Sequence, residues 1–278
     1  MVNQEKIHSR GEMQDFFFDD PVSAKFSLEL SEIRVDYFYF KESMHLETKE
    51  KQVMNIALLK GKSKIIHNDT SYDISQFDFI FLPPNTNIEI IPEVKSVEQN
   101  KICIVKTPII STDINPNVKF EIQRFDFQNF VDRGELSDSK KMATFRTVWT
   151  AFRNGYFMSG FTNIPNKALK QGVVTSVNLE KKSDGSDEIY PHVHHGFPEV
   201  YIFCISDKTI AISQYLINES GESVVKERFD GEGLFFPGHL GHINFVRPTY
   251  KNLDYCQYMW IIGTYGKKSD IEPVTLKA

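Results

Sequence analysis

Short apolar runs separated by clusters of Gly, Pro, Asn and Asp dominate the hydrophobic pattern of this chain. The runs are rich in β-branched and aromatic side chains, which is typical of strands. Helical periodicity is scarce, and its best candidate is residues 142–153. The pattern therefore predicts an all-β protein with few helices. We expect strands at residues 34–40, 53–59, 78–82, 101–105, 173–179, 200–205, 209–216, 233–236 and 255–262.

Two similar phrases indicate an internal duplication. Residues 77–85 read FDFIFLPPN and residues 231–239 read GEGLFFPGH, and each combines a turn, an apolar strand and a proline turn. Each phrase also follows a series of predicted strands, as expected for a repeated domain. We therefore predict two β-barrel domains, at residues 1–125 and 166–278, joined by a connector at residues 126–165.

Composition narrows the range of functions. A chain of 278 residues with 41% hydrophobic content can form two cores without disulfides. The net charge of −5 argues against a nucleic-acid partner. Cys103, Cys204 and Cys256 are too few and too widely spaced for a disulfide framework. No apolar stretch approaches the roughly 20 residues that span a bilayer, and no leader is visible. We therefore expect a soluble cytoplasmic protein with no membrane partner.

The segment YPHVHHGFPEVY, residues 190–201, contains the clearest candidate chemistry. Residues two apart on a strand share a face, so His192 and His194 are expected to project side by side. Glu199 opens the next predicted strand. If the two strands pair antiparallel, the carboxylate returns beside the imidazoles. Two imidazoles and a carboxylate can hold Zn, Fe, Mn or Ni.

His242 is the preferred fourth ligand, because it lies on the strand expected after the proline turn at Pro237. His239 is the competing candidate in the same phrase. Five of the eight histidines lie within about 50 residues, whereas the isolated His8, His45 and His67 are interpreted as surface or core residues. The clustering therefore favours a metal site in the second predicted domain.

In order and spacing, these two phrases resemble the paired motifs of the cupin superfamily. The first has HxH followed by Glu199, and the second has a histidine five positions after Pro237. The resemblance implies a bicupin, in which both domains are jelly-roll barrels. The first domain keeps Pro83 but has Ile88 five positions later. Its barrel is therefore expected to lack a metal site.

Within the cupins, residues 189–266 are similar to the 5-keto-4-deoxyuronate isomerases and the related 5-deoxyglucuronate isomerases. The similarity covers HxH, Glu199-Val200-Tyr201 and the strand that carries Trp260. One departure is Gly196-Phe197, which stands where the family commonly has two arginines. Those arginines could help hold a carboxylated sugar, so their absence bears on the choice of substrate.

The resemblance implies a zinc-dependent aldose–ketose isomerase of a keto-deoxy-uronate, acting in the breakdown of pectin or other uronate polymers. His192, His194, Glu199 and His242 are then the metal ligands. The substrate is a small sugar acid, and the resemblance suggests a homo-oligomer, a hexamer. The acid/base candidates that accompany Glu199 are Tyr258, Asp270 and Glu272.

Two other functions stay open at this point. The same ligand set can hold Fe(II) with open positions, as in a cupin dioxygenase. A non-catalytic sugar-binding cupin is the other alternative, although no output domain such as a helix-turn-helix is evident in the sequence.

Overall fold

A computed structural model gives the fold. It describes the backbone of residues 14–16, 25–30, 33–108, 119–125, 131–132, 147–153, 157–163, 178–181, 187–190, 192–194, 199–218, 220–236, 240–246, 253–263 and 271–273. It describes the side chains of residues 34–107, 119–125, 160–162, 199–218, 220–235, 240–242, 244 and 253–261. Within these ranges the chain is nearly all strand, and its one helical turn is the 3-10 turn η1 (Val97–Gln99).

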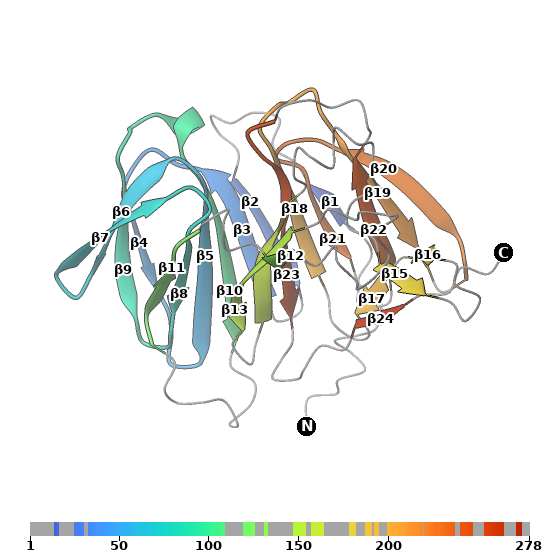
Figure 1. The fold of residues 1–278 in the computed structure, drawn as a ribbon. Coiled ribbons are helices and arrows are strands. Elements are labelled where there is room, and N and C mark those ends of the chain that lie inside the picture. The colour runs from blue at the N-terminus through green and yellow to red at the C-terminus, as the bar shows by residue number, and fades with distance from the viewer. Residues whose placement is uncertain are drawn as a thin grey trace.

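Two antiparallel sheets form the first barrel (Figure 1). The six-stranded sheet has the order β11 (Glu121–Gln123), β8 (Phe79–Leu82), β5 (Gln52–Lys60), β10 (Lys101–Pro108), β3 (Ile33–Tyr39) and β2 (Lys25–Leu30). The four-stranded sheet has the order β4 (Met44–Glu47), β9 (Asn87–Pro92), β6 (Lys62–His67) and β7 (Thr70–Ser75). Apolar side chains from both sheets, such as Ile56 and Ile90, form the interior of this barrel.

The second barrel also has two large sheets. The seven-stranded sheet has the order β1 (Gln14–Phe16), β21 (Gly233–Phe236), β18 (Glu199–Ile205), β23 (Cys256–Gly263), β14 (Phe157–Asn163), β13 (Thr147–Arg153) and β12 (Val131–Asp132). The five-stranded sheet has the order β20 (Ser223–Arg228), β19 (Ile212–Ile217), β22 (Gly241–Val246), β17 (His192–His194) and β24 (Ile271–Pro273). A separate hairpin pairs β15 (Asn178–Lys181) with β16 (Asp187–Tyr190).

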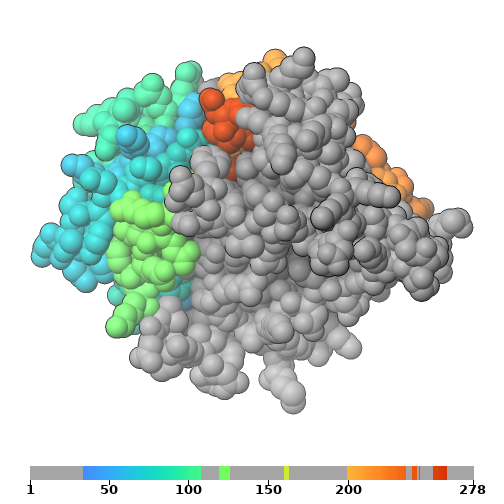
Figure 2. Space-filling view, viewed as in Figure 1, coloured from blue at the N-terminus to red at the C-terminus, as the bar shows by residue number. Residues whose placement is uncertain are grey.

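The large sheets of the two barrels have matching strand orders, which confirms the two-barrel, all-β prediction. The neighbours β8, β5, β10 and β3 of one correspond to β21, β18, β23 and β14 of the other. At one edge of each large sheet lies a strand that precedes the other barrel in the sequence. β1 lies at the beginning of the sequence but pairs with β21 of the second barrel. β11 pairs with β8 of the first, and residues 119–125 lie against that barrel in green in Figure 2.

Each predicted strand is present in the described ranges, but β19 begins at Ile212 and not at residue 209; residues 173–177 lie outside the described ranges. The predicted helix at residues 142–153 is wrong for its described part, since β13 pairs with β12 and β14. The sequence TVWTAFR of β13 is rich in β-branched and aromatic residues, and these favour a strand over a weakly amphipathic helix. No helix in the described part of the chain is long and apolar enough to cross a membrane.

A third apolar core lies between the two large sheets. Tyr37, Phe77 and Phe79 from the first barrel pack with Phe161 and Met259 from the second. The ring centroids of Phe77 and Phe161 are 5.1 Å apart in an edge-to-face arrangement. The barrels therefore share a buried interface between their large sheets.

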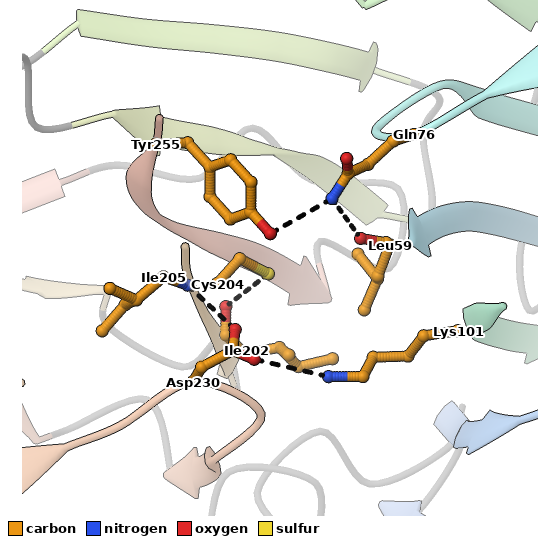
Figure 3. Close-up of polar contacts among 8 residues, drawn as sticks. All are labelled: Leu59, Gln76, Lys101, Ile202, Cys204, Ile205, Asp230 and Tyr255. Carbon is orange, nitrogen blue, oxygen red and sulfur yellow. Dashed lines mark hydrogen bonds and ion pairs between the residues drawn. The ribbon is translucent and has the colours of Figure 1, made fainter. Parts of the chain in front are cut away.

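Polar contacts cross the same interface (Figure 3). The Gln76 Nε2 group donates to the Leu59 carbonyl at 2.9 Å and to the Tyr255 hydroxyl of the second barrel at 3.3 Å. The Lys101 Nζ atom lies 3.9 Å from Asp230 Oδ2, while Asp230 Oδ1 accepts the Ile205 amide at 2.9 Å. These contacts fix how the two sheets sit against one another.

Candidate metal centre

Glu199 and His242 face each other inside the second barrel. Glu199 is the first residue of β18 in the seven-stranded sheet, and His242 is the second residue of β22 in the five-stranded sheet. The Glu199 Oε2 and His242 Nε2 atoms are 3.4 Å apart, and their side chains are 2% and 1% exposed. The opposing sheets therefore bring a carboxylate and an imidazole together out of contact with solvent.

The backbone fixes the tautomer of His242. Its Nδ1 atom lies 3.1 Å from the carbonyl oxygen of Leu240. A carbonyl oxygen only accepts hydrogen bonds, so Nδ1 carries the proton and donates it. In the neutral imidazole, the Nε2 atom then presents its lone pair toward Glu199. This is how a second hydrogen bond commonly orients a metal-binding histidine.

The Glu199 carboxyl lies in an environment that disfavours its charge. Burial raises the pKa of this carboxyl well above its ordinary value, and a hydrogen bond with Tyr201 lowers it in part. The Tyr201 ring also contacts His242 edge to face, with centroids 5.4 Å apart. Tyr201 thus contacts both the carboxyl of Glu199 and the imidazole of His242.

β17 places the backbones of the other two predicted ligands at the same site. It pairs with β22, and the Cα atom of His192 lies opposite that of His242. On its other side β17 pairs with β24, where His194 lies opposite Ile271 and Val193 opposite Glu272. The side chains of His192, His194 and Glu272 lie outside the described part of the structure.

The expected hairpin between the HxH strand and the Glu199 strand is wrong. β17 belongs to the five-stranded sheet, whereas β18 pairs with β21 and β23 of the seven-stranded sheet. The chain passes from one sheet to the other between residues 194 and 199. Glu199 therefore approaches His242 across the barrel interior and not as a neighbour along a hairpin.

The acid/base candidates differ in what is known of them. Tyr258 is buried in the same interior, and its ring centroid is 4.9 Å from that of Tyr201. Asp270 and the competing ligand His239 lie outside the described residues. Side chains that the structure describes form no group of three or more His, Cys, Asp or Glu residues able to hold a metal. They supply two of the four predicted ligands, Glu199 and His242.

Three further buried polar side chains of the second barrel were not predicted from the sequence. Asn244 lies two residues after His242 on β22, and Gln214 is its cross-strand partner on β19. Arg228 donates a hydrogen bond from Nε to Gln214 Oε1 at 2.9 Å. The two-residue period of a strand could have identified Asn244 from His242. Nothing in the apolar run that contains Gln214 marks it as facing the site.

The donors present fit a divalent cation of the zinc type. An imidazole nitrogen and a carboxylate oxygen are ligands that Zn²⁺, Mn²⁺ and Fe²⁺ all accept. The lone pair of His242 Nε2 faces the Glu199 carboxylate across 3.4 Å. A cation bound to both would offset the cost of burying that carboxylate.

The first barrel has apolar residues at the corresponding positions. Ile88 follows Pro83 by five positions, as His242 follows Pro237, and Leu46 is its cross-strand partner as His192 is that of His242. Met54 opposite Leu82 corresponds to Glu199 opposite Phe236. Ile88 and Met54 are buried in the first core. These positions supply no metal ligand there.

Comparisons with known proteins identify the fold. No protein-family model and no curated protein matches the sequence. Among solved structures, an IolB-like protein from Salmonella typhimurium LT2 is 11% identical with a TM-score of 0.51, covering 92% of each chain. A cupin 2 conserved barrel domain protein from Leptotrichia buccalis is 12% identical with a TM-score of 0.50, covering 90% of this chain and 96% of its own.

Bacillus subtilis oxalate decarboxylase is a third such structure. One of its variants is 10% identical with a TM-score of 0.53, and the match covers 92% of this chain and 78% of that chain. At these identities the likeness concerns the fold alone. The chain has the cupin fold with two barrels.

Proposed function

We propose that this protein is a metal-dependent, zinc-type aldose–ketose isomerase of a keto-deoxy-uronate such as 5-keto-4-deoxyuronate. One observation carries the proposal: the buried Glu199–His242 pair, 3.4 Å apart at the point where the backbone of His192 lies opposite His242. His192, His194, Glu199 and His242 are the proposed ligands. Support for a cupin metal also comes from the oxalate decarboxylase of Bacillus subtilis, which has Mn(II) centres.

The chemistry requires moving a proton between adjacent carbons while negative charge builds on a substrate oxygen. When bound, Zn²⁺ supplies a Lewis acid that stabilises such charge without redox activity. The protein's own part is to keep the ligand atoms fixed: Leu240 orients the imidazole of His242, and Tyr201 holds the Glu199 carboxyl. The apolar interior around them excludes water and so strengthens each electrostatic contact.

Tyr258 is the proposed proton carrier among the described side chains. Its ring lies in the same interior, and the Tyr201 ring contacts both Tyr258 and His242. A group within reach of the reacting carbon must give up and take back one proton during the isomerisation. Asp270 and Glu272 stay alternative candidates for this role.

The test combines metal analysis with turnover. Protein purified without chelator is expected to hold about one divalent ion per chain, and to isomerise 5-keto-4-deoxyuronate until a chelator removes that ion. Glu199→Gln is expected to lose metal affinity by roughly 10- to 100-fold or more, since it removes a charged ligand. Glu89→Gln is the matched control, because His45 and Glu89 form a similar pair, 3.8 Å apart, with His45 largely exposed.

Three results would count against this proposal: no turnover by metal-loaded protein, turnover that survives complete removal of the metal, or equal metal loss in the Glu89→Gln control. Oxygen consumption by an iron-loaded preparation would instead favour a cupin dioxygenase.

A further inference from the structure

Two buried amide side chains stand beside the candidate metal centre. Asn244 and Gln214 are cross-strand partners on β22 and β19, and both are 0% exposed. Asn244 lies two residues beyond His242 on the same strand, so both project from one face. That face is the barrel interior, because His242 contacts Glu199 and Tyr201 of the opposite sheet. The two amides thus form a polar patch next to the metal-binding pair.

This patch has unused hydrogen-bonding capacity. The Oε1 atom of Gln214 accepts the hydrogen bond from Arg228, which fixes the orientation of the amide. Among the side chains and backbone that the structure describes, the Nε2 atom of Gln214 then has no hydrogen-bond partner, and neither do the Oδ1 and Nδ2 atoms of Asn244. Buried polar groups are normally paired, because leaving them unpaired costs free energy. Two adjacent amides in this state therefore indicate a polar ligand.

The first barrel shows that the fold does not require these amides. The positions that correspond to Asn244 and Gln214 are Ile90 and Ile65, which are cross-strand partners on β9 and β6. Both isoleucines are 0% exposed and belong to the apolar core of that barrel. In the first barrel, which has no Glu–His pair at the corresponding positions, these positions are apolar. In the second barrel they are polar and lie beside Glu199 and His242.

We propose that Asn244 and Gln214 are specificity-determining residues that bind hydroxyl groups of an open-chain polyhydroxy acid held at the Glu199–His242 site. The inference rests on the proposed function and names the part of the substrate that these residues recognise. A hydroxyl group donates one hydrogen bond and can accept two. It can therefore donate to Asn244 Oδ1, and it can accept from Asn244 Nδ2 and from Gln214 Nε2. A ligand whose carbon chain has no hydroxyl groups leaves the two Asn244 amide atoms and Gln214 Nε2 unpaired, so it is expected to bind more weakly.

The experiment uses two nearly isosteric variants, Asn244→Leu and Gln214→Met, in the full metal-loaded protein. D-gluconate and hexanoate serve as probes, since they are acids of equal carbon number with and without hydroxyls. By calorimetric titration the intact protein is expected to bind gluconate more tightly than hexanoate. Each variant is expected to weaken gluconate binding about tenfold and to leave hexanoate binding unchanged. The KM for 5-keto-4-deoxyuronate should rise in parallel, with metal content maintained in both variants. The melting temperature should be maintained in Asn244→Leu and lowered in Gln214→Met, which also removes the acceptor of the Arg228 hydrogen bond.

Gln257→Met is the matched control. The Gln257 amide is equally buried and also has no hydrogen-bond partner among the described residues. It alternates with Cys256 and Tyr258 of the barrel interior and so lies on the opposite face of β23. This variant is expected to leave gluconate affinity unchanged. Asn244→Ala and Gln214→Ala, which demand no extra space, replace the larger substitutions if either prevents folding.

The proposal is overturned if the intact protein does not prefer gluconate over hexanoate. It is also overturned if the variants lose stability but keep gluconate affinity, as a structural role of the amides would predict. If the protein prefers gluconate, loses this preference in the Asn244 and Gln214 variants, and shows no isomerase turnover, the hydroxyl-binding subsite is supported and only the proposed reaction is rejected. Turnover with an unchanged KM in both variants would retain the reaction and reject the subsite.

Discussion

The cysteine thiols and the site residues illustrate opposite consequences of burial. Cys103, Cys204 and Cys256 are all free and buried among apolar side chains. Burial raises the pKa of each thiol, that of Cys256 to about 12. Glu199 meets the same desolvation, but it faces an imidazole that can share a cation with it. The thiols are therefore unreactive in the folded protein, whereas a cation shared with the imidazole would offset the cost of burying the carboxyl.

The first prediction concerns these thiols. A group with a pKa of about 12 is ionised in only about one molecule in ten thousand at pH 8, and the thiolate is the reactive form. Burial also blocks access of reagents. We expect the folded protein to react with no thiol reagent at pH 8 on a timescale of minutes, and to show three reactive thiols after unfolding. Rapid labelling of any of the three in the folded state, measured by mass spectrometry, would contradict this.

The sequence pointed to Glu199 and His242, the two ligand candidates whose side chains the structure describes, because their signal is local. The HxH phrase, Glu199 and the spacing from Pro237 to His242 are all readable along the chain. Tyr201 and Gln214 were not readable in this way, and Asn244 was readable only through its two-residue spacing from His242. Which strands pair and which sheets oppose one another decides that Tyr201 and Gln214 lie beside the metal-binding pair, and a two-residue period contains neither kind of information.

At the scale of elements, alternation along the strands decides which core each side chain enters. In β18 the residues Tyr201 and Phe203 face the second barrel, whereas Val200 and Ile202 face the first. Both faces are therefore apolar, which makes such a strand easy to predict. The partners of a strand are harder to predict: the β17–β18 hairpin was expected from proximity in the sequence, but the two strands belong to opposing sheets.

The second prediction concerns the tight turn between β5 and β6. Gly61 has φ +92°, and a Cβ atom there would overlap the backbone carbonyl oxygen of Gln99. The segment that contains Gln99 cannot move away easily, because the Asn100 Nδ2 group donates to the carbonyls of Val94 and Ser96 at 2.6 and 2.9 Å. We expect Gly61→Ala to lower the free energy of unfolding by about 2–4 kcal/mol, combining the cost of the backbone conformation with that of overpacking.

Gly221 offers the matched comparison for this turn. Its φ is +87°, but no atom lies within 4 Å of a Cβ atom placed there. Gly221→Ala should therefore cost only about 1–2 kcal/mol, the conformational share alone. Denaturant titration of both variants measures the difference. Equal losses would show that the loop near Gln99 adapts without cost.

At the scale of the whole molecule, the interface between the large sheets makes one structure from two barrels. Its apolar part is continuous across both sheets, and charged groups lie at its border. Lys101 is 5% exposed, with its ammonium 4.8 Å from the centre of the Tyr39 ring. Burial alone would lower the pKa of Lys101, but Tyr37 and Asp230 raise it above its ordinary value. The ammonium therefore stays charged and depends on Asp230.

The third prediction follows from the unequal burial of this ion pair. Asp230→Asn leaves the Lys101 charge buried, and we expect a loss of about 2–4 kcal/mol in the free energy of unfolding. Lys101→Met leaves Asp230 with solvent contact and its hydrogen bond from the Ile205 amide, so about 1 kcal/mol or less should be lost. The double variant should recover most of the larger loss. A double-mutant cycle by denaturant unfolding tests this, and the reverse order of the single variants would refute it.

The fourth prediction is that both barrels unfold in one transition, because separating them would expose the shared apolar core to water. The two tryptophans provide a clean probe. Trp149 and Trp260 lie on β13 and β23, both in the seven-stranded sheet, so their fluorescence reports the second barrel alone. Circular dichroism reports the strands of both barrels. We expect the two signals to give the same midpoint in denaturant.

Phe77→Ala sharpens this experiment. The Phe77 ring contacts Phe161 and Tyr255 of the second barrel, with centroids 5.1 Å away in each case. Alanine keeps the Cβ atom at a φ of +71°, so the change reports the lost ring rather than relief of backbone strain. Because the ring lies in the shared core, its loss should lower both midpoints together, by about 3–5 kcal/mol in the free energy of unfolding. Two separated transitions, with fluorescence following only one of them, would mean that each barrel is stable without the other.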